Sequence, residues 1–193
     1  MPTEKRSELR TARLRLRRWV ESDREPFARL NGDPVVMELF PSPLSSEQSD
    51  GFADRIDGHF EREGFGLWAV EVADGSDLAG EFIGFTGLWP VGFDAHFTPA
   101  IEVGWRLASR SWGRGYAPEA ARAAVADGFD RLGFDEIVSM TSVINHKSRR
   151  VMAKIGMTRD PADDFDHPSM AAGDRLERHV LYRIRPEDLV DDG

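Results

Sequence analysis

The chain has 193 residues, a net charge of −9 and no cysteine, which suits one domain and excludes disulfides, thiolate metal sites and cysteine nucleophiles. Its acidity argues against a nucleic-acid-binding face, and no apolar run approaches the roughly 20 residues of a membrane span. The charged N-terminus lacks the apolar core of a signal peptide, so we expect a cytoplasmic protein without nucleic-acid or membrane partners.

The first half of the chain predicts an opening strand, two helices and a two-stranded hairpin. Leu14 and Leu16 alternate with arginines, which indicates an opening strand with one buried face that extends toward Trp19. Ser22 and Asp23 are good N-caps for a short helix that ends near residue 32. A second helix is expected from Ser45 or Ser46 to residues 64–66, followed by strands at 67–72 and 82–88 that form a hairpin.

The second half alternates strands with helices. After a loop at 90–99 rich in glycine, proline and aromatic residues, we expect strands at 101–107, 137–143 and 176–184. Helices are expected at 118–131 and 145–155, and residues 161–173 form a polar loop. This order predicts a mixed α/β (α+β) sheet in a single domain over residues 1–193, with a core of about 12–185 and flexible charged ends.

The junction between the strand at 101–107 and the next helix carries the strongest chemical signal. Gly113 and Gly115, one residue apart, let the backbone turn sharply and point several N–H groups one way. The helix N-terminus behind them adds positive charge, so the junction predicts a phosphate or pyrophosphate site. A dinucleotide fingerprint fails because Pro118 stands at the third glycine position, and no Gly-Lys-Ser/Thr of a P-loop is present.

Two motifs in order resemble the GNAT superfamily of N-acetyltransferases. The first is the run Ile101–Leu107 followed by Arg110-x-x-Gly113-x-Gly115-x-Ala117, and the second is Asn145-x-x-Ser148 with the segment 151–157. The Glu-x-Gly-Trp strand and the Asn-x-x-Ser helix start are most similar to the RimJ/RimL-type branch. That branch acetylates protein N-terminal amines and also contains small-molecule acetyltransferases.

The resemblance implies a single-domain GNAT fold that uses acetyl-CoA as co-substrate, without a metal. Two neighbouring parallel strands, 101–107 and 137–143, would splay apart, and the pantetheine arm would pair with the exposed backbone of the first strand. The expected cofactor-binding residues are Val103, Trp105, Leu107, Arg110, Gly113, Arg114, Gly115, Tyr116, Ala117, Asn145 and Ser148. Arg110 and Arg114 could instead be solvated surface charges.

The resemblance also implies direct acetyl transfer in a ternary complex, with no covalent enzyme intermediate. Glu102 is the expected general base, because the acceptor amine must lose a proton before it attacks; the alternative for this residue is an outward-facing strand glutamate or a salt-bridge partner. Ser148 is the expected donor to the leaving thiolate, with helix capping as its alternative role. The backbone N–H of Val103 or Trp105 would stabilise the oxyanion, and the sequence does not choose between them.

The acceptor site is expected in the N-terminal part, with Phe40 and Trp89 as substrate-binding residues. Aromatic residues of the loop at 90–99 could line that pocket, pack as core or lid, or form a homodimer contact. The acceptor is a protein N-terminal amine or a small-molecule amine such as a metabolite or antibiotic. A non-catalytic acyl-CoA-binding module is the alternative function, and the five histidines show no metal-ligand spacing.

Overall fold

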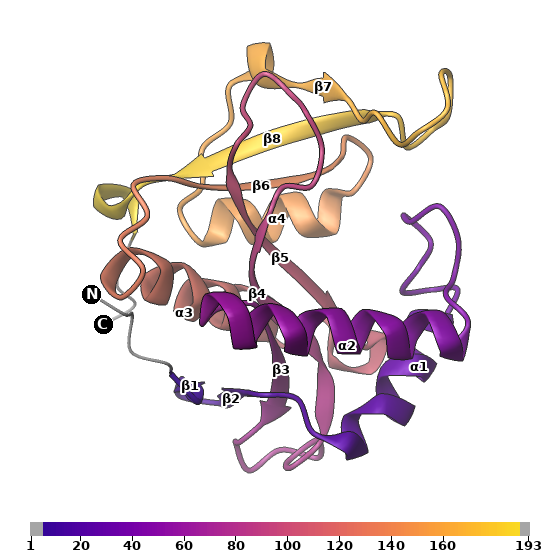
Figure 1. Cartoon of the computed structure of the whole chain (residues 1–193), viewed down its shortest axis with the longest axis vertical. Coiled ribbons are helices and arrows are strands. Elements are labelled where there is room, and N and C mark those ends of the chain that lie inside the picture. The colour runs from indigo at the N-terminus through magenta and orange to yellow at the C-terminus, as the bar shows by residue number, and fades with distance from the viewer. Residues whose placement is uncertain (1–5, 190–193) are drawn as a thin grey trace.

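A computed structural model describes residues 6–189, in which eight strands form one mixed sheet (Figure 1). The order across the sheet is β1-β2-β3-β4-β5-β6-β8-β7. The strands are β1 (Glu8–Arg10), β2 (Leu14–Arg17), β3 (Leu67–Val72), β4 (Phe82–Pro90), β5 (Ile101–Leu107), β6 (Ile137–Ser142), β7 (Phe165–Asp166) and β8 (Arg178–Ile184). The predicted flexible ends fall largely outside the described residues.

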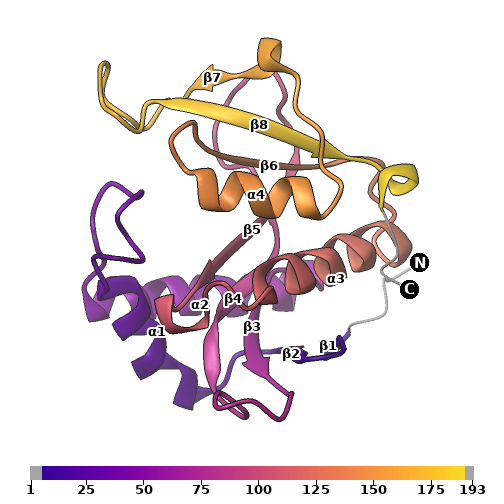
Figure 2. The same ribbon diagram turned by 180° about the vertical axis from the view of Figure 1, so that it is seen from behind.

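Four α-helices cover the two faces of this sheet. The helices are α1 (Arg24–Gly32), α2 (Ser46–Glu63), α3 (Tyr116–Asp130) and α4 (His146–Lys154). Figure 1 shows α2 in front of the sheet, and Figure 2 shows α3 and α4 in front of it from the opposite side. Ser45 starts α2 through a capping box with Gln48, which satisfies two backbone donors at the helix start.

Most expected elements are present, and several of their boundaries differ from the prediction. The opening strand ends at Arg17, because the chain turns there and the Trp19 indole donates a hydrogen bond to the carbonyl of Leu67. The last strand begins at Arg178 rather than at residue 176. The edge strands β1 and β7 were not predicted, since three and two residues are too short to display an alternating pattern.

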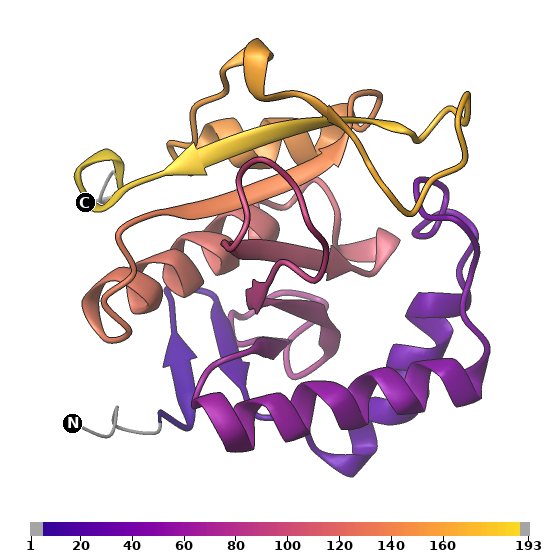
Figure 3. The same cartoon turned by 45° about the horizontal axis from the view of Figure 1, so that its top comes forward.

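The sheet opens in its middle, between β5 and β6. These strands form the parallel pair, and their register contains a single position, Glu102 opposite Val138. On their other sides both strands are paired along their length, β5 with β4 over seven positions and β6 with β8 over six. Figure 3 shows β6 running beside β8 and away from β5, as the predicted splay requires.

Two main apolar clusters hold the layers together. One packs α1 and α2 against β2 to β4, around the fully buried Phe27, Ile56 and Trp68. The other packs α3 and α4 against β4, β5 and β6, around Val125 and Met152. The splayed strand β5 is therefore fixed between a helix layer on each face.

A substitution at Gly128 tests how closely α3 packs against the sheet. A Cβ at this position would lie 2.7 Å from Leu88 and 2.8 Å from Ile137, so Gly128→Val should overpack the layer and cost about 1–3 kcal/mol of unfolding free energy. Gly51→Val in α2 is the matched control, because its Cβ would make only an ordinary contact with Arg55. Denaturant unfolding of both variants checks this, and equal losses would contradict the packing argument.

Candidate active site

Glu102 occupies the last paired position before β5 leaves β6. Its partner on the neighbouring strand β4 is Trp89, whose ring packs on His59 of α2 with 4.3 Å between ring centroids. The Glu102 side chain therefore faces the α1 and α2 side of the sheet, deep in the molecule yet partly accessible. Among the described residues, its carboxyl group has no hydrogen-bond or ion-pair partner.

Burial controls the ionisation of this carboxyl group. Removal from water disfavours the charged form and raises the pKa of Glu102 to about 7. His59 adds no positive charge to the site, because burial lowers the pKa of its imidazole and keeps the ring neutral. Glu102 is thus half ionised near neutral pH, a condition suited to a group that accepts and returns a proton.

The same face of β5 continues through Gly104 to Arg106. Gly104 and its partner across β4, Gly87, place no side chain there, and Oε1 of Glu102 lies 3.8 Å from where a Cβ on Gly104 would be. Arg106 follows, with its guanidinium 4.2 Å from the Phe40 ring centroid. Arg106 was not predicted as a site residue. The sequence did contain a signal for it, because alternate residues of a strand share one face, and Arg106 follows Glu102 by four residues.

We call the face of β5 that runs from Glu102 through Gly104 to Arg106 the strip. The predicted substrate-binding residues, Phe40 and Trp89, lie at its opposite ends. Trp89 flanks Glu102 across β4, and Phe40, from the segment between α1 and α2, covers Arg106 and is 36% exposed. The structure thus brings both aromatic residues to the face that carries the base candidate. Their contact with a substrate stays a prediction.

The predicted phosphate loop has the geometry that anion binding requires. Gly113 and Gly115 both have positive φ, 78° and 81°, which only glycine adopts at low cost. Gly115 is the N-cap of α3 and supplies no side-chain cap. Among the described residues, no acceptor is found for the N–H groups of residues 113 to 117, so this N-terminus keeps unpaired donors.

Side chains around the loop are engaged within the protein. Arg110 pairs with Glu81, and Arg114 pairs with Asp77 through two contacts of 2.5 and 3.0 Å. Both carboxylates come from the segment that joins β3 to β4. The Tyr116 ring is buried and its hydroxyl donates to Asp74, so only its backbone faces the loop. Ala117 lies in the first turn of α3.

The N-terminus of α4 holds the second predicted motif. The Asn145 side chain accepts a hydrogen bond from the Ser148 backbone N–H at 3.1 Å and donates to the Thr141 hydroxyl at 2.9 Å. Asn145 is therefore the cap of this helix, and Ser148 is not. The Ser148 hydroxyl is partly accessible and has no partner among the described residues, which leaves it available to a ligand.

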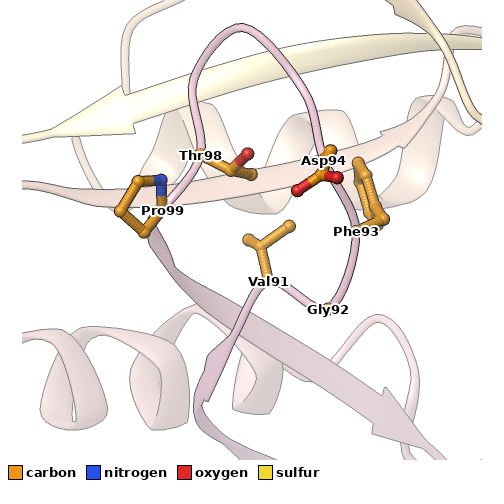
Figure 4. A pocket seen from close by; sticks show the side chains of 6 residues that line it. All are labelled: Val91, Gly92, Phe93, Asp94, Thr98 and Pro99. Atoms are coloured by element: carbon orange, nitrogen blue, oxygen red, sulfur yellow. The ribbon is translucent and has the colours of Figure 1, made fainter.

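The loop between β4 and β5 closes the end of the sheet beside Glu102. A hydrogen bond from Val91 to Ala100 joins its base, and a hollow of about 350 Å³ lies within it, lined by Val91, Gly92, Phe93, Asp94, Thr98 and Pro99 (Figure 4). Phe97 packs on Phe165 with 5.1 Å between ring centroids, as the packing interpretation of these aromatic residues requires.

The histidines near this loop pack with the same aromatic cluster. The rings of His167 and His179 lie 4.8 Å apart, with Phe93 against His167, and His96 contacts Asp163 at 3.4 Å. Across the described residues 6–189 no group of three or more histidine, aspartate or glutamate side chains could hold a metal ion.

Comparison with known proteins assigns this arrangement to a class. Residues 13–158 match the family model described as an acetyltransferase (GNAT) domain. The chain is 34% identical over 189 residues to the FsC-acetyl coenzyme A-N(2)-transacetylase of Aspergillus fumigatus, covering 93% of this chain and 77% of that protein. An acetyltransferase structure from Agrobacterium tumefaciens aligns with a TM-score of 0.72 and 28% identity, covering 93% and 95% of the two chains.

A RimJ structure from Mycobacterium smegmatis in complex with CoA-disulfide aligns with a TM-score of 0.71 at 20% identity, covering 92% and 84% of the two chains, which shows the shared fold. Together these matches define an acyltransferase of the kind that uses acetyl-CoA. The chain belongs to the GNAT acetyltransferase family, and the single-domain mixed α/β fold predicted from its motifs is confirmed. No helix within residues 6–189 has the length and apolar character needed to span a membrane.

Replacing Glu102 tests the burial of its carboxyl group independently of activity. A folded-state pKa of about 7, above the usual 4.5, means that the folded protein binds the proton more tightly, so stability falls as pH rises from about 4.5 through 7. Glu102→Gln should therefore match the wild type near pH 4.5 and exceed it at pH 8, by at most about 3 kcal/mol.

Denaturant unfolding at both pH values measures this difference. Glu38→Gln is the matched control, because Glu38 is exposed and has no side-chain partner among the described residues. A Glu102→Gln variant that is less stable than the wild type at pH 8 would show that the carboxylate is stabilised in the fold.

Proposed function

We propose that the protein transfers the acetyl group of acetyl-CoA directly to an amine, with Glu102 as the general base. The observation that carries the proposal is the carboxyl group of Glu102, buried without a partner at the point where β5 leaves β6. A group with a pKa of about 7 is basic enough to take a proton at neutral pH and acidic enough to lose it again.

The same pKa favours amines of low basicity as acceptors. An α-amino group with a pKa near 7.7–8.0 loses a proton to Glu102 at a cost of about one pKa unit. A lysine-like amine, near 10.4, costs more than three units. The proposed acceptor nitrogen is therefore an α-amine or one of similar pKa.

The loop of residues 113 to 117 would hold the pyrophosphate with its unpaired N–H groups, while Arg110 and Arg114 could turn from their carboxylate partners to it. Both ion pairs are exposed, and such pairs contribute at most about 1 kcal/mol, so a phosphate can compete for them. The pantetheine arm would lie along the part of β5 that β6 leaves unpaired, past Val103, Trp105 and Leu107.

Two groups would support the acyl transfer itself. A backbone N–H of Val103 or Trp105 would donate to the oxyanion of the tetrahedral intermediate. The Ser148 hydroxyl, at the start of α4 and without a partner among the described residues, would donate to the departing thiolate. Acetyl-CoA supplies the activated acyl group, and Glu102 holds the proton that the amine releases.

Two acceptor classes follow from the comparisons. The Aspergillus relative, at 34% identity, is named as a transacetylase that acts at an N(2) nitrogen of FsC. This name favours a small-molecule amine as the acceptor of the present protein. The RimJ structure, at 20% identity, shares the fold. The motifs of this chain resemble the RimJ/RimL branch, and this resemblance makes a protein N-terminal α-amine the second candidate acceptor. A cytoplasmic location and a homodimer stay predictions.

The base assignment predicts the pH dependence of turnover. In the wild type, kcat/KM for an amine acceptor should rise with pH through an inflection near 7 as Glu102 loses its proton. Glu102→Gln should lower kcat/KM by about 10²–10⁴ and remove that inflection, with the Kd for acetyl-CoA unchanged. Thiol release across pH 5.5 to 9 measures both effects, and full activity in the variant would remove Glu102 from the mechanism.

The phosphate loop can be tested with two glycines of equal backbone strain. Gly113 and Gly133 have φ of 78° and 71°, and a Cβ on either would meet nothing within 4 Å, so alanine should cost each about 1–2 kcal/mol of stability. Gly113→Ala should also weaken CoA binding about 10- to 100-fold, because its methyl group keeps the pyrophosphate from the N–H groups. Calorimetric titration that finds equal CoA affinities in both variants would place the pyrophosphate elsewhere.

A further inference from the structure

Arg106 is a largely buried cation without a counter-charge among the described residues. Burial lowers the pKa of its guanidinium to about 10, so the group stays charged at neutral pH. Among the described residues it has no carboxylate partner, and its Nε is buried with no hydrogen-bond acceptor. Arginine is almost never buried unless it is paired, so this arrangement needs a reason.

Two other partly or largely buried arginines, Arg17 and Arg183, are paired with carboxylates. Arg17, only 12% exposed, contacts both Asp23 and Glu71, and these carboxylates raise its pKa. Arg183 bridges Glu136 and Asp163 in the same way, and its pKa is also raised. Arg17 and Arg183 thus each contact two carboxylates, whereas Arg106 contacts none among the described residues.

Neutral groups hold the Arg106 guanidinium in place. It donates a hydrogen bond to the side-chain carbonyl of Asn31, which is itself fully buried and fixed by a 2.8 Å hydrogen bond to Ser49. The rings of Phe40 and Phe85 lie 4.2 and 5.5 Å from its central carbon. These contacts orient the cation but leave its charge uncompensated, which is the state of a prepared anion site.

Arg106 and Glu102 point to the same face of β5, with only Gly104 between them on that face. Glu102 leans over Gly104, which is about 7 Å along the strand from Arg106. Neither charge affects the pKa of the other group, so the two do not pair. The strip between them offers a proton acceptor at one end and a cation at the other.

We propose that Arg106 binds an anionic group, in the first instance a carboxylate, on the acceptor itself, so that the preferred acceptors are small amines that also carry an anionic group. The acceptor amine then lies at Glu102 and its carboxylate at Arg106, across the position where Gly104 has no side chain. This inference rests on the proposed acetyl transfer and adds the charge of the acceptor to it.

The test compares amino acids with their carboxamides, in which a neutral amide replaces the carboxylate and the amine is less basic. The kcat/KM ratio of acid to amide, measured by thiol release, is compared among the wild type, Arg106→Gln and Arg106→Lys at one pH, so that differences in amine basicity cancel. The ratio should fall about 10- to 100-fold in Arg106→Gln and by less in Arg106→Lys, which keeps the charge but loses the planar fork. Arg29→Gln, an exposed arginine on α1 paired with Glu25, is the control and should leave it unchanged.

A structural role for Arg106 would raise KM for acids and amides alike and leave the ratio unchanged, which overturns the proposal. The second source of an anion is CoA, whose phosphates would then be the partner. In that case Arg106→Gln would weaken CoA binding in calorimetry, whereas we expect its Kd to be unchanged.

A direct titration separates this inference from the proposed function. Benzoate should bind the CoA-loaded wild type and shift the Arg106 Nε–H resonance in a ¹⁵N NMR spectrum, and benzamide should not. Transfer to amides with no binding of benzoate overturns the anion site alone. No transfer to any amine counts against the proposed function, and binding of benzoate would still establish the site at Arg106.

Discussion

The contact between β5 and β6 at a single position is the constraint on which the site depends. Each strand is paired along its other edge, β5 with β4 and β6 with β8, so each half of the sheet is complete on its own. Because of this, the sheet can open in its middle without leaving either half unsupported. The opening leaves one edge of β5 without a strand partner beyond Glu102, and it places that glutamate where burial and access coincide.

Two unpaired ionisable groups on one face of β5 distinguish the site from the rest of the molecule. Arg17, by contrast, contacts the carboxylate of Asp23, which raises the pKa of its guanidinium. At Glu102 and Arg106 burial shifts the pKa toward the neutral form instead. Such groups reduce the stability of the folded chain, which is the usual sign that a ligand or a reaction requires them.

Local patterns predicted the elements and the phosphate loop, because glycine spacing, caps and alternation act over a few residues. The limits of β3 and β5 and the role of Asn145 as a cap were read in this way and agree with the structure. Arg106 could not be assigned from sequence, since its environment comes from Asn31 and Phe40, more than 60 residues away. The carboxylate partners of Arg110 and Arg114 lie beyond such patterns for the same reason.

The pairing of Arg110 with Glu81 and of Arg114 with Asp77 makes the predicted phosphate loop close to electrically neutral. Any anion that recruits these arginines exchanges one negative partner for another and releases two carboxylates on the segment between β3 and β4. A small monovalent ion gains little from that exchange, whereas a pyrophosphate brings more charge and also engages the backbone donors. If the loop binds a phosphate as predicted, Glu81 and Asp77 would raise the charge that a ligand must carry to occupy it.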